Sequence, residues 1–209
     1  MITRLIDQTD PAALPDAVAI LRKGGVVSFP TDTVYGIGGL AGSSPAIDRL
    51  FSIKGRAFDK PVPVMIGRMD QLELIASSIP PAAHRLAEKF WPGPLTLVLP
   101  KRPELPVKLT SLSGVGVRIP DHEFTLALLE QCGPLAVTSA NRSGAPETHS
   151  ASEVLEQLDG SLELVVDGGH SPGGTASTVV DLSGSRARIL REGPITQQMI
   201  DQVLQDLIW

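Results

Sequence analysis

Cysteine is almost absent from the sequence. Cys132 is the single cysteine among 209 residues, which excludes a disulfide framework and a zinc site built from cysteines. A chain with one thiol is typical of a reducing compartment. The four histidines lack the spacing of metal ligands, so the sequence predicts no metal site formed by the protein itself.

Long apolar runs, aromatic residues and excess positive charge are also lacking. No apolar run is long enough to cross a bilayer, and the N-terminal stretch MITRLID has no signal-peptide core. We therefore expect a cytoplasmic protein with no membrane partner. A net charge of -5 and an isoelectric point near 5.3 argue against a protein that chiefly coats nucleic acid. With one tyrosine and two tryptophans, there are few side chains on which bases could stack.

The chain does contain enough apolar sequence for one buried domain. Hydrophobic residues make up 42% of it, and 20 glycines and 18 prolines divide the apolar segments. We find no internal repeat or linker and predict one α/β domain, residues 1–209, around a mixed sheet. Helices are expected over residues 10–24, 44–55, 72–76, 80–90, 123–132, 150–158 and after Pro194. Strands are expected over residues 26–29, 62–66, 95–99, 115–120, 135–138, 164–166, 177–182 and 187–190.

Residues 25–56 are the stretch around which the rest is organised. The buried strand 26–29 leads into a loop, Pro30 to Gly36, that carries hydroxyls, a carboxylate and a phenol. A helix then starts with Ser44 as N-cap and ends at Gly55. It places Lys54 in its last turn and Arg56 just beyond, as a pair of cations suited to an anionic substrate. Later in the chain, the apolar run 95–99 (LTLVL) is expected to be covered on both faces.

Two familiar motifs occur without their structural context. GIGGLA, residues 36–41, fits a dinucleotide fingerprint, but the helix opens several residues too late, so we interpret it as a turn. GHSPG, residues 169–173, fits a nucleophile elbow around Ser171. Pro172 lacks the amide N–H that such an elbow uses as an oxyanion-hole donor, so a serine hydrolase is not expected.

Small polar or cationic groups follow three predicted strands. They are Thr31 to Tyr35, Arg118, and Ser139 to Asn141; Lys54, Arg56, Lys60 and Arg191 add further charge. Ligands of open α/β sheets bind beyond strand ends, and transfer at phosphorus depends mostly on positioning and charge stabilisation. Taken singly, Lys54 also fits a cation that complements a helix dipole, while Lys60 and Arg191 fit solvated surface charges. Arg118 fits a surface role poorly, because an arginine between Val117 and Ile119 in a strand needs a partner.

Six motifs in order carry a resemblance to a known family. They are PTDTVYGIG, KGR, VGVRIPDH, SANRSG, STVVDL and LREG, between Gly25 and Gly193. In this respect the chain resembles the YrdC/Sua5 family, whose members are L-threonylcarbamoyladenylate synthases. The resemblance is to the short form, without the C-terminal domain of the Sua5 type. It implies a twisted mixed β-sheet flanked by helices, with a concave, positively charged site.

The resemblance also implies a reaction. L-threonine, bicarbonate (or CO2) and ATP would form threonylcarbamoyl-AMP and pyrophosphate, which makes the enzyme a nucleotidyltransferase. Mg2+ would arrive with ATP. The product would feed a transferase machinery that forms N6-threonylcarbamoyladenosine at position 37 of tRNA. Weak binding of tRNA, or of double-stranded RNA, is a further expectation.

Site residues carry over by position. The family's polar and cationic tetrad falls on Lys54, Arg56, Ser139 and Asn141, which would hold the triphosphate. Thr33, Arg118 and Ser177 match threonine-binding positions. Arg191 and Lys60 match nucleotide contacts, and Thr31 and Tyr35 belong to the substrate pocket.

The chain departs from the family pattern at five positions, namely Ala57, Met65, Gly114, Glu147 and Ala176. Three alternatives to the synthase remain, and Met65 and Glu147 bear on the first of them. One is a YciO-like paralogue that adenylates a different carbamate. Another is an RNA-binding module. The third is the related chemistry of the matching domain in hydrogenase maturation proteins.

Overall fold

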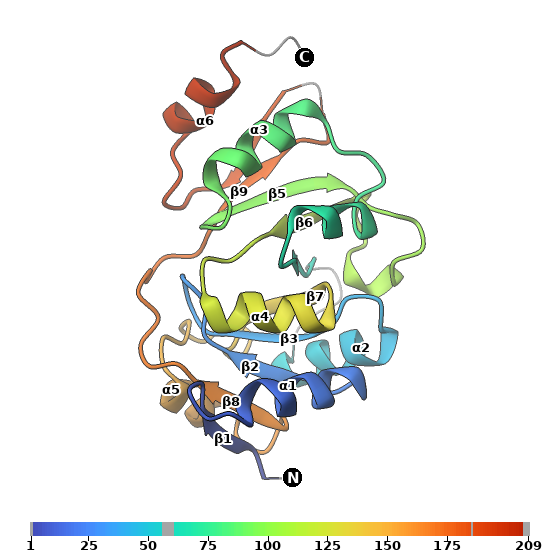
Figure 1. Ribbon diagram of the computed structural model, residues 1–209. Coiled ribbons are helices and arrows are strands. Elements are labelled where there is room, and N and C mark those ends of the chain that lie inside the picture. The colour runs from blue at the N-terminus through green and yellow to red at the C-terminus, as the bar shows by residue number, and fades with distance from the viewer. Residues whose placement is uncertain (1, 56–60, 185, 207–209) are drawn as a thin grey trace.

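One long β-sheet runs along the length of the molecule (Figure 1). The computed structural model describes residues 2–55, 61–184 and 186–206. Within these residues the strand order is β1 (Arg4–Asp7), β8 (Leu164–Asp167), β2 (Val27–Phe29), β3 (Gly36–Leu40), β7 (Leu135–Ser139), β4 (Val64–Met65), β6 (Gly114–Arg118), β5 (Leu95–Pro100), β9 (Thr178–Asp181) and β10 (Arg188–Arg191). The pairs β1–β8, β8–β2, β4–β6 and β5–β9 are parallel and the others antiparallel. The predicted α/β fold with a twisted mixed sheet is confirmed.

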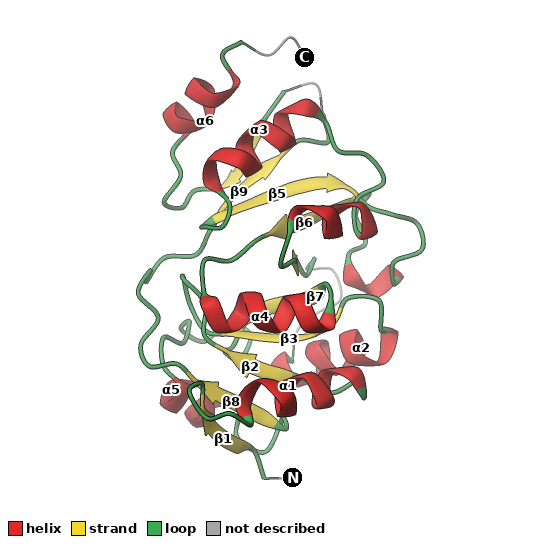
Figure 2. Cartoon of the chain, viewed as in Figure 1, coloured by secondary structure: helices red, strands yellow, loops and turns green. Residues whose placement is uncertain are grey.

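Helices cover the sheet in groups along its length (Figure 2). They are α1 (Ala13–Arg22), α2 (Ser44–Lys54), α3 (Pro81–Phe90), α4 (Glu123–Cys132), α5 (Ala151–Leu158) and α6 (Gln197–Leu204), with short 3-10 helices at Met69–Leu74 and Val107–Leu109. The packed pair α1 and α4 lies over the half of the sheet that contains β2, and α3 and α6 pack together near β5. The elements β1 and α6 lie at opposite ends of the molecule.

The half of the sheet around β2 is apolar on both faces. Phe29, Leu135 and Val137 belong to the core cluster under α1 and α4. Ile37 and Val165 belong to the larger core cluster, which lies on the side of α2 and α5. Because successive strand residues point to opposite faces, these short strands need apolar residues at nearly every position.

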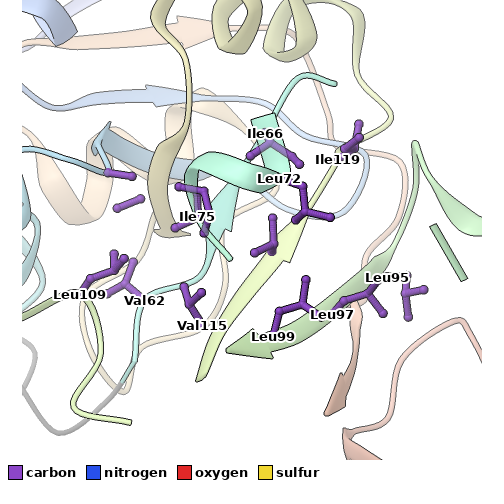
Figure 3. Packing of buried hydrophobic residues seen from close by; sticks show 14 of the residues in the cluster. Val62, Ile66, Leu72, Ile75, Leu95, Leu97, Leu99, Leu109, Val115 and Ile119 are labelled. Carbon is purple, nitrogen blue, oxygen red and sulfur yellow. The ribbon is translucent and has the colours of Figure 1, made fainter. Parts of the chain in front are cut away.

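The half around β5 and β6 packs into the hydrophobic core on one face only. Leu95, Leu97, Leu99 and Val115 pack into the larger core cluster (Figure 3). The alternate positions of these strands, among them Thr96 and Val98, line a pocket instead. The expectation that residues 95–99 are covered on both faces was therefore wrong, and the polar Thr96 marks the open face.

Residues 36–40 are a strand and not the turn expected from their glycines. They form β3, antiparallel to both β2 and β7. The glycines give room for close packing, since a Cβ on Gly36 would lie 2.9 Å from a methyl of Val137. A Cβ on Gly39 would lie 2.9 Å from the Cβ of Ala46 on α2. The glycine pattern therefore reflects close packing of strand and helix.

Two further elements differ from the sequence prediction. Strand β1 was not expected; it is a mostly exposed edge strand whose partner, β8, lies far along the chain. The helix expected at 72–76 is a 3-10 helix at Met69–Leu74. The first helix starts later than predicted, since the N-cap of α1 is Ala12 and not Asp10. The cap predictions for α2 came within a residue: Ser43, and not Ser44, caps it, and Gly55 ends it in the left-handed conformation. Ser150 caps α5 as expected.

Candidate functional site

A cavity of about 320 Å3 opens on the uncovered face of β5 and β6. The loop after β2 and the end of β7 contribute to one side, and the segments around β9 and β10 to the other. Its polar lining residues include Thr31, Thr33, Thr96, Arg118, Ser139, Glu147, Ser177 and Arg191. Its apolar lining residues include Pro63, Met65, Val98, Leu112, Val137, Val179 and Leu190. A pocket with an apolar floor and a few convergent polar groups is typical of small-molecule sites.

Strand β6 forms the floor of this cavity. Its sequence GVGVR alternates, so that Val115 and Val117 enter the core while Gly114, Gly116 and Arg118 line the pocket. A Cβ on Gly114 would lie 2.8 Å from a methyl of Val98, and one on Gly116 would lie 3.0 Å from a methyl of Thr96. The two glycines thus keep the floor flat up to Arg118.

Arg118 is the buried cation at the polar end, with 4% of its surface exposed. Its Nε donates to the Gly93 carbonyl at 2.9 Å, and Nη1 donates to Thr33 Oγ1 at 3.1 Å. Its Nη2 donates to a carboxylate oxygen of Asp32, forming an ion pair. The partner that the sequence required for this arginine is therefore Asp32, which was not among the predicted site residues.

Ser177 and Arg191 form a second polar group across the pocket. The Ser177 hydroxyl lies 2.8 Å from Thr96 Oγ1. Arg191 donates from Nη2 to both the carbonyl and the hydroxyl of Ser177, at 2.8 and 3.1 Å. Arg191 therefore lines the pocket while it remains exposed to solvent, so it lies at the pocket rim. Thr96 was missed, although it is the one polar residue in LTLVL.

Lys54 is buried against the end of β7. Its Nζ donates to the carbonyl of Ser139 at 2.5 Å, to Ser139 Oγ at 3.3 Å and to Asn141 Oδ1 at 3.0 Å. Asn141 is fixed in turn by donating to the Ala145 carbonyl at 2.6 Å. Three of the four predicted tetrad residues are thus brought together, and Lys54 does more than complement a helix dipole. Ser139 lines the pocket, and Lys54 and Asn141 lie next to it.

Burial shapes the electrostatics of the two arginines. Desolvation lowers the pKa of Arg118, while the Asp32 carboxylate raises it and the like charge of Arg191 lowers it. Desolvation also lowers the pKa of Arg191, against the nearby Glu147 carboxylate, which raises it. The cavity lining thus holds two arginines and one carboxylate, that of Glu147, among the described residues.

Tyr35 lines the pocket, but its hydroxyl is engaged elsewhere. It donates to the Gly169 carbonyl at 2.7 Å and accepts from the Gly168 N–H at 3.0 Å. Burial raises the pKa of Tyr35 to about 12. The phenol thus anchors the loop after β8.

Other predicted positions fall into three groups. Thr31 lines the pocket, and its hydroxyl donates to the Val34 carbonyl at 2.6 Å. Arg56, Lys60 and Ala57 lie outside the described residues. The remaining four departures from the family pattern, Met65, Gly114, Glu147 and Ala176, all line the cavity.

The motif at 169–173, which the sequence excluded as a nucleophile elbow, does not present an exposed serine. Ser171 is buried, with 2% of its surface exposed, and Pro172 follows it, as the sequence indicated. Across the described part of the chain, no group of three or more His, Cys, Asp or Glu could hold a metal ion. No helix in that part is long and apolar enough to cross a membrane.

Comparison with known proteins places this chain in a family. The model of the Sua5/YciO/YrdC family, described as "Telomere recombination", matches residues 19–193. The chain belongs to the Sua5/YciO/YrdC family.

Relatives of the family differ in length. The threonylcarbamoyl-AMP synthase of Pyrococcus abyssi is 43% identical over 91% of this chain and 57% of its own. The putative threonylcarbamoyl-AMP synthase of Mycobacterium tuberculosis strain H37Rv is 39% identical over 97% of this chain and 96% of its own. This chain therefore spans little more than half the length of the first of these relatives.

Solved structures of the family share the fold. The crystal structure of P. abyssi Sua5 complexed with L-threonine matches with a TM-score of 0.93 at 40% identity, over 98% of this chain and 62% of that one. E. coli YciO matches with a TM-score of 0.82 at 28% identity, over 92% of this chain and 97% of that one. Full-length HypF, at 21% identity, shares the fold alone.

Replacing Tyr35 by Phe tests its anchoring role. We expect Tyr35→Phe to lower the free energy of unfolding by about 1 kcal/mol, because two hydrogen bonds to the loop after β8 are lost. Urea unfolding followed by circular dichroism measures this change. Ligand-dependent activity should stay within twofold of wild type; a large loss of activity with unchanged stability would show that the hydroxyl acts on the ligand.

His122 provides a test of pH dependence. It caps α4, and its Nδ1 is buried without a hydrogen-bond partner among the described residues. Desolvation lowers its pKa from the ordinary 6.5. The unfolded chain then binds this proton more readily, so stability is retained above pH 6.5 and falls as the pH drops from there through the lower native pKa.

We expect His122→Asn, which places a residue type favoured at the N-cap position there, to reduce the loss of stability between pH 7 and pH 5. The measurement is urea unfolding at both pH values. His84→Asn, on an exposed face of α3, controls for the substitution itself. An unchanged pH dependence in His122→Asn would contradict this account of the buried imidazole.

Proposed function

We propose that this protein is an L-threonylcarbamoyladenylate synthase. It would join L-threonine, bicarbonate or CO2, and ATP into threonylcarbamoyl-AMP with release of pyrophosphate, as a nucleotidyltransferase. One observation carries the proposal: the polar end of the pocket (Thr33, Arg118, Ser177) occurs in a fold that matches a relative complexed with L-threonine. The synthase names of relatives about 40% identical over most of this chain support it.

The threonine carboxylate would bind at Arg118. A guanidinium presents its N–H groups in a fork that matches a carboxylate. Thr33 and Ser177 place hydroxyls on the two sides of this end of the pocket. The amine of threonine would attack CO2, and the carbamate oxygen would attack the α-phosphorus in line with departing pyrophosphate.

The triphosphate would bind near Lys54, Ser139 and Asn141, with Arg56 and Arg191 adding charge. Lys54 has protein acceptors for its ammonium group in this structure. Binding of a phosphate would therefore exchange one of these contacts for a phosphate oxygen. Positioned cations stabilise the charge that develops in phosphoryl and nucleotidyl transfer.

Mg2+ would enter with ATP. The cavity lining contains Glu147 as a carboxylate but no cluster of metal ligands among the described residues. Mg2+ bound through substrate phosphates suits such a donor set. In a cytoplasmic setting, the product would pass to a transferase machinery that modifies tRNA. Weak binding of tRNA or double-stranded RNA remains part of this proposal.

The first test is pyrophosphate release from ATP and bicarbonate, with and without L-threonine. We expect Arg118→Ala to reduce threonine-dependent release about tenfold to a hundredfold, because a charge-assisted contact to the carboxylate is lost. Lys54→Ala should reduce it by about a hundredfold or more, since a positioned charge is removed. Arg188→Ala is the matched control, because this arginine is exposed on β10 and pairs with Asp181.

Each other outcome favours a different function. Release of pyrophosphate that ignores threonine would indicate a paralogue with another substrate, as E. coli YciO is a structural relative. No release under any condition, together with salt-dependent binding of tRNA, would favour the RNA-binding module.

A further inference from the structure

Asp32 is not one of the residues that line the binding pocket. Its carboxylate pairs with Arg118, and the two side chains are 12% and 5% exposed. Arg118 and Thr33 line the cavity, whereas Asp32 and Gly93, the other two partners of the guanidinium, do not. The carboxylate therefore contacts the arginine without lining the cavity.

The three contacts of Arg118 come from two segments other than its own strand. Gly93 belongs to the turn before β5, Asp32 and Thr33 to the loop after β2, and Arg118 itself ends β6. Each guanidinium nitrogen has one of these partners, which fixes the plane of the group. Of its five N–H bonds, one on Nη1 and one on Nη2 have no partner among the described residues. These two are the donors left for a bound anion.

The cost of burying the charged guanidinium of Arg118 has to be offset by favourable interactions. Burial and the nearby charge of Arg191 both act against the charged form of Arg118, and Asp32 acts in its favour. His122 also interacts with Asp32, and desolvation lowers the pKa of this histidine. The imidazole is therefore neutral at pH 7, and the Asp32 carboxylate is engaged by Arg118.

We propose that Asp32 is a positioning residue, which holds Arg118 so that its two remaining N–H groups are aligned for the carboxylate of an α-amino acid. It acts through Arg118 and does not touch the substrate. This inference rests on the proposed function, which supplies the amino acid. Because the three contacts fix the guanidinium before the ligand arrives, binding does not have to order it.

The test is the steady-state kinetics of Asp32→Asn, which keeps the size of the side chain and removes its charge. We expect the KM for L-threonine to rise about tenfold to a hundredfold. The KM for ATP and the kcat at saturating threonine should stay within about threefold of wild type. A merely structural defect would instead lower the active fraction and leave both KM values unchanged.

A matched control comes from a second ion pair outside the pocket. Arg49 and Glu163 lie 2.5 Å apart and are partly exposed, and neither lines the cavity. Glu163→Gln should leave the KM for threonine within twofold of wild type. An equal rise of that KM in both variants would overturn the inference.

A double-mutant comparison covers the case in which Asp32→Asn does not fold. Arg118→Met removes the guanidinium, so adding Asp32→Asn to it should change the KM for threonine by less than twofold. A further tenfold rise would show that Asp32 acts on the substrate directly and would overturn the inference. Wild-type protein without threonine-dependent turnover would overturn the proposed function instead, so the two failures are distinguishable.

Discussion

The buried charge of Arg118 determines how the segments around the polar end of the cavity are arranged. A guanidinium at the end of a central strand, with 4% of its surface exposed, needs a counter-charge and hydrogen-bond acceptors from the protein. Its partners come from the loop after β2 and from the turn before β5. Pairing Arg118 therefore draws three distant segments to one point, and this convergence forms the polar end of the cavity.

The cavity itself exists because β5 and β6 pack into the core on one face only. Leu97 and Val117 pack into the core, and the opposite face carries Thr96, Val98 and two glycines. Around β2 and β8 the sheet is buried on both faces. The uncovered face of β5 and β6 is where a ligand can lie against the strands.

Sequence patterns predicted the elements whose determinants are local. Helix caps such as Ser150 and Gly55, and the paired strands at the C-terminal end, follow from nearby residues and were confirmed. Strand β3 was missed because its glycines are also typical of a turn, and only the neighbouring Val137 and Ala46 explain them. Strand β1 was missed because it forms by pairing with β8, which is distant in sequence.

The same distinction applies to the site. The strand-end positions of Thr33, Arg118 and Ser139 could be predicted from the sequence, and the family resemblance supplied roles for them. The ion pair of Arg118 with Asp32 could not, because the two residues are 86 positions apart and nothing local links them. The position of Lys54 against Ser139 and Asn141 likewise depends on where α2 ends relative to β7.

The most direct measurement of the central claim is the fate of the bicarbonate carbon. The protein would be incubated with ATP, L-threonine and 13C-labelled bicarbonate, and the products analysed by mass spectrometry. The account predicts threonylcarbamoyl-AMP carrying the labelled carbon, formed only when all three substrates are present. Cleavage of ATP without a labelled threonine adduct would contradict it.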